Sequence, residues 1–181
     1  MKTSMPTEVK GAPTIAELAA LIRAIKPDIV YCSISGYGQD GPYRDKPAFG
    51  AIGEAMGGLR YVTGEPDRPP ARAGISIGDS LAAMHAVMGI TMALHHRANT
   101  GRGQVIDAAL YESVLGVMEN LITEYDITGY VRERSGSVLP GIAPSNAYPC
   151  ANGEMILIGG NGDNVYARLT EAMGRPDLKT D

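Results

Sequence analysis

The longest regular pattern in the chain is the run DSLAAMHAVMGITMALHHRANTG, residues 79–101, which predicts one long helix. Large apolar residues recur along it at three-to-four spacing, the period of an amphipathic helix. This stripe comprises Leu81, Met84, Met88, Thr91 and Leu94, with Val87 and Ile90 beside them. Basic side chains at 95–97 suit the negative end of the helix dipole, and Gly101 is suited to end the helix.

The segments around this helix predict a mixed α/β fold. Shorter helices are expected over 13–28, 48–59, 111–129 and 163–174, the first with a capping box made by Thr14 and Glu17. Runs rich in β-branched or apolar residues predict strands over 28–35 and 103–110. Residues 147–160 predict a hairpin about Asn152–Gly153. This order indicates the fold class α/β without fixing the strand topology.

Composition and charge narrow the possible partners. The chain has 181 residues, a net charge of −4 and scattered basic side chains, so we expect neither nucleic acid nor an anionic membrane surface as a partner. No run approaches the ~18 uninterrupted apolar residues of a membrane span. Residues 1–14 contain no apolar signal core, which favours a cytoplasmic protein. Cys32 and Cys150 lie far apart in strand-like segments, and we expect free thiols.

Most candidate site motifs have an ordinary structural interpretation. The three histidines share one helix without a cysteine or carboxylate at ligand spacing, so no metal site is expected. The glycine-rich stretches GYGQDGPY and IGGNGDN lack the spacing of phosphate-binding loops, and Asn161 or Asp163 as a helix N-cap explains the second. No G-x-S-x-G nucleophile motif occurs.

Asp79 differs from the other acids because small and apolar residues surround it in GISIGDSLAAM. One interpretation is an N-cap of the long helix, where a carboxylate accepts hydrogen bonds from backbone amides. The other is a catalytic carboxylate, since an ionised acid on an otherwise apolar segment is what a carboxylate nucleophile requires. The two interpretations are compatible, and both stay open from the residues alone.

Three motifs carry a family resemblance: SGYGQDGPYRDKPAF, GDSLAAMHA and TGRGQVIDAALYES. In this order they resemble the class III CoA-transferase family, also called the CaiB/BaiF family, over roughly residues 18–178. The resemblance implies that Asp79 attacks an acyl-CoA thioester, giving an acyl-aspartyl anhydride and then an aspartyl-CoA thioester. It implies acyl-CoA and a small carboxylic acid as partners, with coenzyme A as part of the substrate rather than a permanently bound cofactor.

The resemblance also implies an architecture. Family members are a little over twice this length and form interlocked homodimers, with a Rossmann-like large domain and a small α/β domain. This chain matches their middle portion, without the N-terminal part of the fold. We therefore expect a loose arm over residues 1–12, a partial large domain over 13–134, and a lid loop with the start of the small domain over 135–181. Exposed apolar surface, and weak or no turnover by the isolated chain, are expected of an incomplete fold.

Four further residues are assigned substrate or CoA contacts by the resemblance: Lys46, Phe49, Gly78 and Met84. The racemase branch of the family carries a His-Asp pair where this chain has Phe49–Gly50, which counts against Cα deprotonation. An α-methylacyl-CoA racemase and a non-catalytic CoA-binding or assembly subunit remain the alternatives to a CoA-transferase.

Overall fold

The computed structural model describes residues 14–180, which divide into two compact units. Within this range, residues 14–60 and 73–127 form the first unit, and residues 61–72 and 128–180 form the second. The first unit contains α1 (Ile15–Ile25), β1 (Tyr31–Ser35), α2 (Gly50–Met56), α4 (Ile77–Thr100), β2 (Val105–Ala109), α5 (Leu110–Leu115) and α6 (Leu121–Thr128). The short helix α3 (Leu59–Val62) lies where the chain passes between the units. The arm predicted over residues 1–12 lies outside the described residues.

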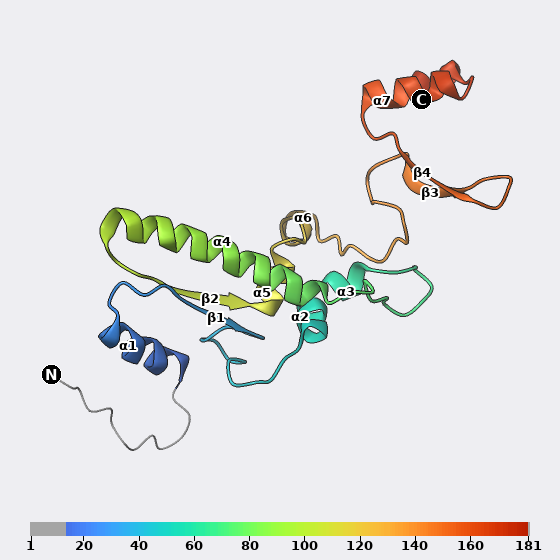
Figure 1. The fold of residues 1–181 in the computed structure, drawn as a ribbon. Coiled ribbons are helices and arrows are strands. Elements are labelled where there is room, and N and C mark those ends of the chain that lie inside the picture. The colour runs from blue at the N-terminus through green and yellow to red at the C-terminus, as the bar shows by residue number, and fades with distance from the viewer. Residues whose placement is uncertain (1–13, 181) are drawn as a thin grey trace. The chain divides into compact units, whose positions relative to one another are not determined.

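The first unit is built on a parallel strand pair. β1 and β2 pair from Tyr31 opposite Val105 to Ser35 opposite Ala109. The long helix α4 packs along both strands, and Figure 1 shows α1 on their other side. The predicted capping box of α1 is confirmed: Thr14 and Glu17 exchange side-chain and backbone hydrogen bonds. Both predicted strands of this unit are therefore present, joined by a helical crossover.

The helix α4 begins earlier than the sequence pattern predicted. Its N-cap residue is Ser76, and the Ser80 N–H donates to the Ser76 carbonyl at 3.1 Å. Asp79 is thus the third residue of the helix, and the interpretation of Asp79 as the N-cap is wrong. The reason is that Ile77 and Gly78 already adopt helical geometry. At the other end, Gly101 ends the helix with φ 70°, as expected.

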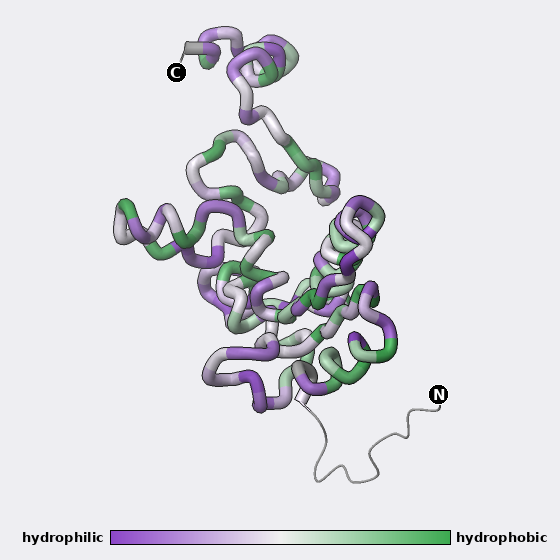
Figure 2. Tube along the Cα trace, turned by 90° about the vertical axis from the view of Figure 1, so that its left-hand side faces the viewer, coloured by the Kyte–Doolittle hydropathy of each residue, from purple (hydrophilic) through white to green (hydrophobic). Residues whose placement is uncertain are grey.

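The buried face of α4 is its small-residue face. Gly78, Ala82, Ala86 and Ala93 are buried, whereas the stripe of large apolar residues stays mostly exposed; Met84, for example, is 63% exposed. The trace of α4 in Figure 2 accordingly mixes hydrophobic with hydrophilic residues. Small side chains allow the helix to approach the strands and α2 closely. The packing face of α4 is therefore the face with the smallest residues, and not the face with the stripe of large apolar residues.

The helix predicted over residues 111–129 is two helices. α5 ends at Leu115 with Gly116 as its C-cap, and Glu119 interrupts the following segment with a left-handed φ of 54° before α6 begins. α5 buries one face, Leu110 and Val114 among it, against α2 and α4. The apolar period of the sequence predicted one continuous helix here. The structure instead has a short packed helix, a turn and a second helix.

The second unit contains β3 (Ser145–Pro149), β4 (Met155–Gly159), α7 (Asp163–Ala172) and the 3-10 helix η1 (Pro176–Thr180). The predicted hairpin is confirmed, with β3 and β4 antiparallel and Gly153 at φ 84°. The N-cap of α7 is Gly162, so neither Asn161 nor Asp163 caps this helix. Gly174 follows the helix with φ 70°, as expected of a C-terminal glycine.

Segment 61–72 belongs to the second unit because it bonds to the loop around residue 135. The Gly136 N–H donates to the Gly64 carbonyl at 2.9 Å, and Arg134 Nη1 donates to the Tyr61 carbonyl at 3.0 Å. The described chain therefore divides at residue 127. The domain boundary expected after residue 134 concerns the domains of the complete family fold, and it stays a prediction.

Among residues 14–180, α4 is long and apolar enough to cross a membrane by length and composition alone. That criterion is weak, because core helices of soluble proteins also meet it. In the described structure α4 packs on β1, β2, α2 and α5.

Candidate active site around Asp79

Helix α2 presents a face of glycines to its neighbours. A Cβ on Gly53 would lie 2.8 Å from the Leu110 Cβ, and one on Gly57 would lie 2.7 Å from the Val114 Cβ. A Cβ on Gly78 of α4 would lie 2.9 Å from the Gly50 carbonyl oxygen. The first turns of α2 and α4 therefore meet with almost no side chain between their backbones.

Asp79 projects from this junction. It lies in the first turn of α4, and its side chain reaches over Gly50, where a Cβ would lie only 2.4 Å from Oδ2. The residue is exposed, and its carboxylate makes no hydrogen bond or ion pair with another of residues 14–180. An exposed carboxylate without partners keeps its lone pairs available for an electrophile. The first-turn amides of α4 have no intrahelical acceptor, so they favour negative charge at this point.

A second carboxylate lies beneath the same junction. Glu54, one turn after Gly50 on α2, is 1% exposed, and its Oε2 accepts a hydrogen bond from Arg60 Nε at 2.9 Å. Its Cγ lies 3.3 Å from where a Cβ on Gly78 would be. Sequence reasoning did not select this pair. The available signal was a charged residue within the otherwise small and apolar run FGAIGEAMGG.

The four residues predicted to contact substrate are brought together only in part. Gly78 packs against α2 beside Asp79, and Phe49 is the N-cap of α2, 80% exposed and adjacent to Gly50. Met84 lies further along α4 with most of its side chain in solvent. Lys46 lies in the loop before α2, and its Nζ is positioned over the ring of Tyr43, 3.9 Å from the ring centroid.

That loop carries an aromatic cluster that sequence reasoning also missed. Tyr37 lies 5.3 Å from Tyr43 and 6.1 Å from Tyr111 between ring centroids. The loop is tied to β2 because the Gln39 N–H donates to Asp107 Oδ2 at 2.6 Å. The glycine-rich stretch GYGQDGPY is therefore an anchored turn.

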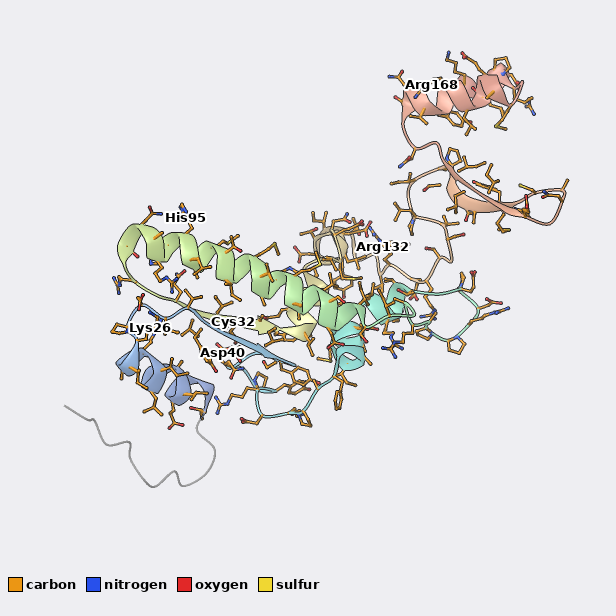
Figure 3. The ribbon with its side chains drawn as sticks, in the orientation of Figure 1. Lys26, Cys32, Asp40, His95, Arg132 and Arg168 are labelled. Atoms are coloured by element: carbon orange, nitrogen blue, oxygen red, sulfur yellow. The ribbon has the colours of Figure 1, made fainter. Side chains whose placement is uncertain are left out.

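The pKa values of two groups near this loop are shifted. The hydrogen bond from the Tyr111 hydroxyl to Glu112 raises the pKa of Tyr111. Burial, and secondarily the charge of Asp107, raises the pKa of the Cys32 thiol. A smaller fraction of this thiol is therefore ionised to the nucleophilic thiolate. Both cysteines are free, as expected. Figure 3 shows Cys32 on β1 and Asp40 in the loop that follows.

No group of three or more His, Cys, Asp or Glu side chains within residues 14–180 is arranged to hold a metal ion. His95 lies near the end of α4 farther from α2 (Figure 3), about 24 Å along the helix from Asp79 at ~1.5 Å per residue.

Comparison with solved structures identifies the fold. A crystal structure of a CaiB/BaiF family protein from Brucella suis superposes with a TM-score of 0.72 at 35% sequence identity, covering 88% of this chain and 42% of that one. The mixed α/β architecture is thus part of the CaiB/BaiF fold, as the sequence resemblance predicted.

Sequence comparison identifies the family. The family model for CoA-transferase family III matches residues 18–181, and the chain belongs to this family. It is 56% identical over 160 residues to the succinyl-CoA–D-citramalate CoA-transferase of Chloroflexus aurantiacus, covering 88% of this chain and 40% of the relative. It is 38% identical over 153 residues to the succinate–glutarate CoA-transferase of Agrobacterium fabrum, covering 84% and 38%. The chain thus spans about 40% of the length of these relatives.

Proposed function

We propose that this chain is the nucleophile-bearing part of an acyl-CoA:carboxylate CoA-transferase, with Asp79 as the acyl-carrying residue. The observation that carries the proposal is the exposed, unpartnered Asp79 carboxylate at the closely packed junction of α2 and α4. The family membership and the CoA-transferase activity of the named relatives support it.

The reaction needs no redox step and no metal. The Asp79 carboxylate attacks the thioester carbonyl of the donor, and the C–S bond breaks to give an Asp79–acyl anhydride and the CoA thiolate. The thiolate then attacks the Asp79 carbonyl, forming Asp79–CoA thioester and releasing the donor acid as its carboxylate. The acceptor carboxylate attacks the Asp79–CoA thioester, giving an Asp79–acceptor anhydride and releasing the CoA thiolate. This thiolate attacks the acceptor carbonyl of the anhydride, so that acceptor-CoA leaves and the Asp79 carboxylate is restored. We expect the first-turn amides of α4 to stabilise the developing oxyanion.

We propose dicarboxylic acids as the substrate class. Succinic, citramalic and glutaric acids, which the names of the two relatives contain, all carry two carboxyl groups. One carboxyl group exchanges CoA and the other remains charged, so the complete site needs a cation for it. Phe49, Gly78, Lys46 and Met84 are the further contacts we propose for acyl-CoA, and a homodimer in the cytoplasm is the proposed working form.

The first test is whether Asp79 becomes covalently modified. The 181-residue chain is incubated with succinyl-CoA and its intact mass is measured, and hydroxylamine then converts any Asp79 thioester or anhydride to a hydroxamate that peptide mass spectrometry locates. We expect the adduct on the parent chain and on Asp45→Ala, an exposed acid outside the junction. We expect none on Asp79→Ala, with an unchanged far-UV circular dichroism spectrum, because the Asp79 side chain makes no hydrogen bond with another of residues 14–180.

Turnover is measured in a chimera in which this chain replaces the aligned segment of the Chloroflexus relative. Asp79→Ala should lower CoA exchange by at least about three orders of magnitude, the scale seen when a covalent nucleophile is removed. Exchange that survives in Asp79→Ala would rule out the mechanism. A folded parent chain that forms no adduct, together with a chimera that shows no exchange, would instead favour a non-catalytic CoA-binding or assembly subunit.

A further inference from the structure

The buried carboxylate of Glu54 is only half satisfied. Arg60 bonds Oε2, but Oε1 is buried without a hydrogen-bond partner among residues 14–180. Arg60 itself keeps 27% of its side chain exposed, so the pair is buried from the Glu54 side. A buried ion pair contributes little net stability after desolvation, and an orphaned carboxylate oxygen opposes folding. Replacing a buried ion pair by well-packed hydrophobic side chains of similar volume is often neutral or stabilising. A gain in folding stability therefore does not explain why Glu54 is present.

Contacts lead from this carboxylate to Asp79 in two short steps. Glu54 and Gly50 are four residues apart on α2, so they share one face of the helix. Glu54 packs under Gly78, and Gly50 packs under the carboxylate of Asp79, the next residue of α4. The same α2 face thus supports two consecutive residues of the nucleophile turn.

The orientation of Asp79 has no other visible support. Its carboxylate makes no hydrogen bond or ion pair with any other of residues 14–180, so its direction depends on how the first turn of α4 lies on α2. The Glu54–Arg60 ion pair ties that part of α2 to the first turn of α3. A change in this pair therefore shifts the surface on which Asp79 rests.

We propose that Glu54, held by Arg60, is a positioning residue for Asp79. This inference rests on the proposed function. Glu54 does not touch substrate, since its carboxylate is enclosed beneath the junction. It fixes the seating of α4 on α2 and so holds the Asp79 carboxylate in line with the thioester carbonyl.

The test compares Glu54→Gln with the parent chain in the succinyl-CoA adduct assay, measuring the rate against donor concentration. Gln keeps the shape of the side chain and removes its charge. We expect the maximal rate of adduct formation to fall about tenfold or more, because misplacement of a reacting group by ~1 Å costs up to ~100-fold. The donor concentration at half-maximal rate should change less than about threefold, since the donor contacts remain.

Arg60 variants test the same pair from its more exposed side. Arg60→Met leaves the buried carboxylate without its cation and should lower the maximal rate further than Arg60→Lys, which retains charge. The double variant Glu54→Gln/Arg60→Met should be no slower than Arg60→Met alone, because it removes the uncompensated charge. The matched control is Glu171→Gln, which removes one partner of the exposed Glu171–Lys179 pair and should leave the rate unchanged.

A readout independent of turnover separates this inference from the proposed function. Amidation of Asp79 by a water-soluble carbodiimide with glycine ethyl ester is followed by peptide mass spectrometry, with exposed Asp45 as internal reference. We expect the Asp79:Asp45 labelling ratio to change at least about twofold in Glu54→Gln and to be unchanged in Glu171→Gln. An unchanged ratio, or an adduct rate within twofold of the parent, overturns the positioning role. Absence of the adduct in the parent chain, together with absence of exchange in the chimera, overturns the proposed function. The labelling ratio still tests whether Glu54 controls the position of Asp79.

Discussion

At the scale of single residues, neighbouring charge and burial decide which groups are reactive. Cys32 lies on β1 opposite Ile106, one residue from Asp107 in the strand pairing, and both burial and that charge disfavour its thiolate. Asp79 lies in an exposed first turn with backbone amides beside it. The Cys32 thiol and the Asp79 carboxylate therefore lie in contrasting environments, one partly buried beside a negative charge and the other exposed beside backbone amides.

The reactivity of Cys32 should depend on pH in a defined direction. Since the folded structure raises its pKa above the usual 9.0, the rate of iodoacetamide alkylation in a Cys150→Ser background should rise with pH to a midpoint above 9.0. Asp107→Asn should move the midpoint down, because it removes the raising charge. The midpoint should stay above 9.0, because burial is the larger cause. A midpoint at or below 9.0 in the parent would contradict the buried environment.

At the scale of elements, the glycine face of α2 organises the first unit. It lets α2 approach α4 at Gly50 and α5 at Gly53 with backbones nearly touching. Such approach suits a short helix of seven residues, since close contact along one face compensates for its small number of side chains. The same face carries the carboxylate that we propose positions Asp79.

Two alanine substitutions on this face should have different effects. The new Cβ of Gly53→Ala meets the Leu110 Cβ at 2.8 Å and its backbone carbon at 3.2 Å, so we expect the free energy of unfolding to fall by about 1–3 kcal/mol. The three atoms nearest to the new Cβ of Gly50→Ala all belong to the flexible Asp79 carboxylate, so stability should change little while adduct formation falls sharply.

Chemical denaturation and the succinyl-CoA adduct assay measure the two effects. Exposed Ala55→Gly in the same helix is the control for helix propensity, which costs up to about 1 kcal/mol. Equal loss of stability in both alanine variants would show that Asp79 is rigidly held rather than displaceable.

At the scale of the whole molecule, the described chain leaves much large apolar surface in solvent. Met84, Val87, Met88 and Met92 of α4 are each close to half exposed or more. The expectation of exposed apolar surface is thereby confirmed. A patch along one helix of this kind is rare on a stable monomer and promotes association.

A single charge on this face should reduce that association. Met92→Glu removes an apolar side chain that is 70% exposed, so we expect weaker binding of the dye ANS and a smaller average mass in light scattering after size-exclusion chromatography. Thr91→Glu is the matched control, since it adds the same charge at an exposed polar neighbour without removing apolar surface. Equal dye binding by the parent and Met92→Glu would show that the apolar surface that binds ANS lies elsewhere.

The sequence alone determined the local features of this protein. The capping box at Thr14, the C-terminal glycines at 101 and 174 and the hairpin about Gly153 depend on near neighbours in the chain, and all are present. The two strands of the first unit were also predicted, but their parallel pairing joins residues far apart in the sequence. The family followed from ordered motifs, and the candidate nucleophile Asp79 from an acid among small residues; its catalytic role stays a prediction.

Only the tertiary structure decided the features that depend on distant contacts. The strands and neighbouring helices select the small face of α4 over its large apolar stripe, because close backbone approach requires side chains no larger than Ala. The break at Glu119 follows the packing of α5 rather than the apolar period. The meeting of Glu54, Gly50 and Asp79 joins residues from two helices, which local patterns cannot place relative to one another.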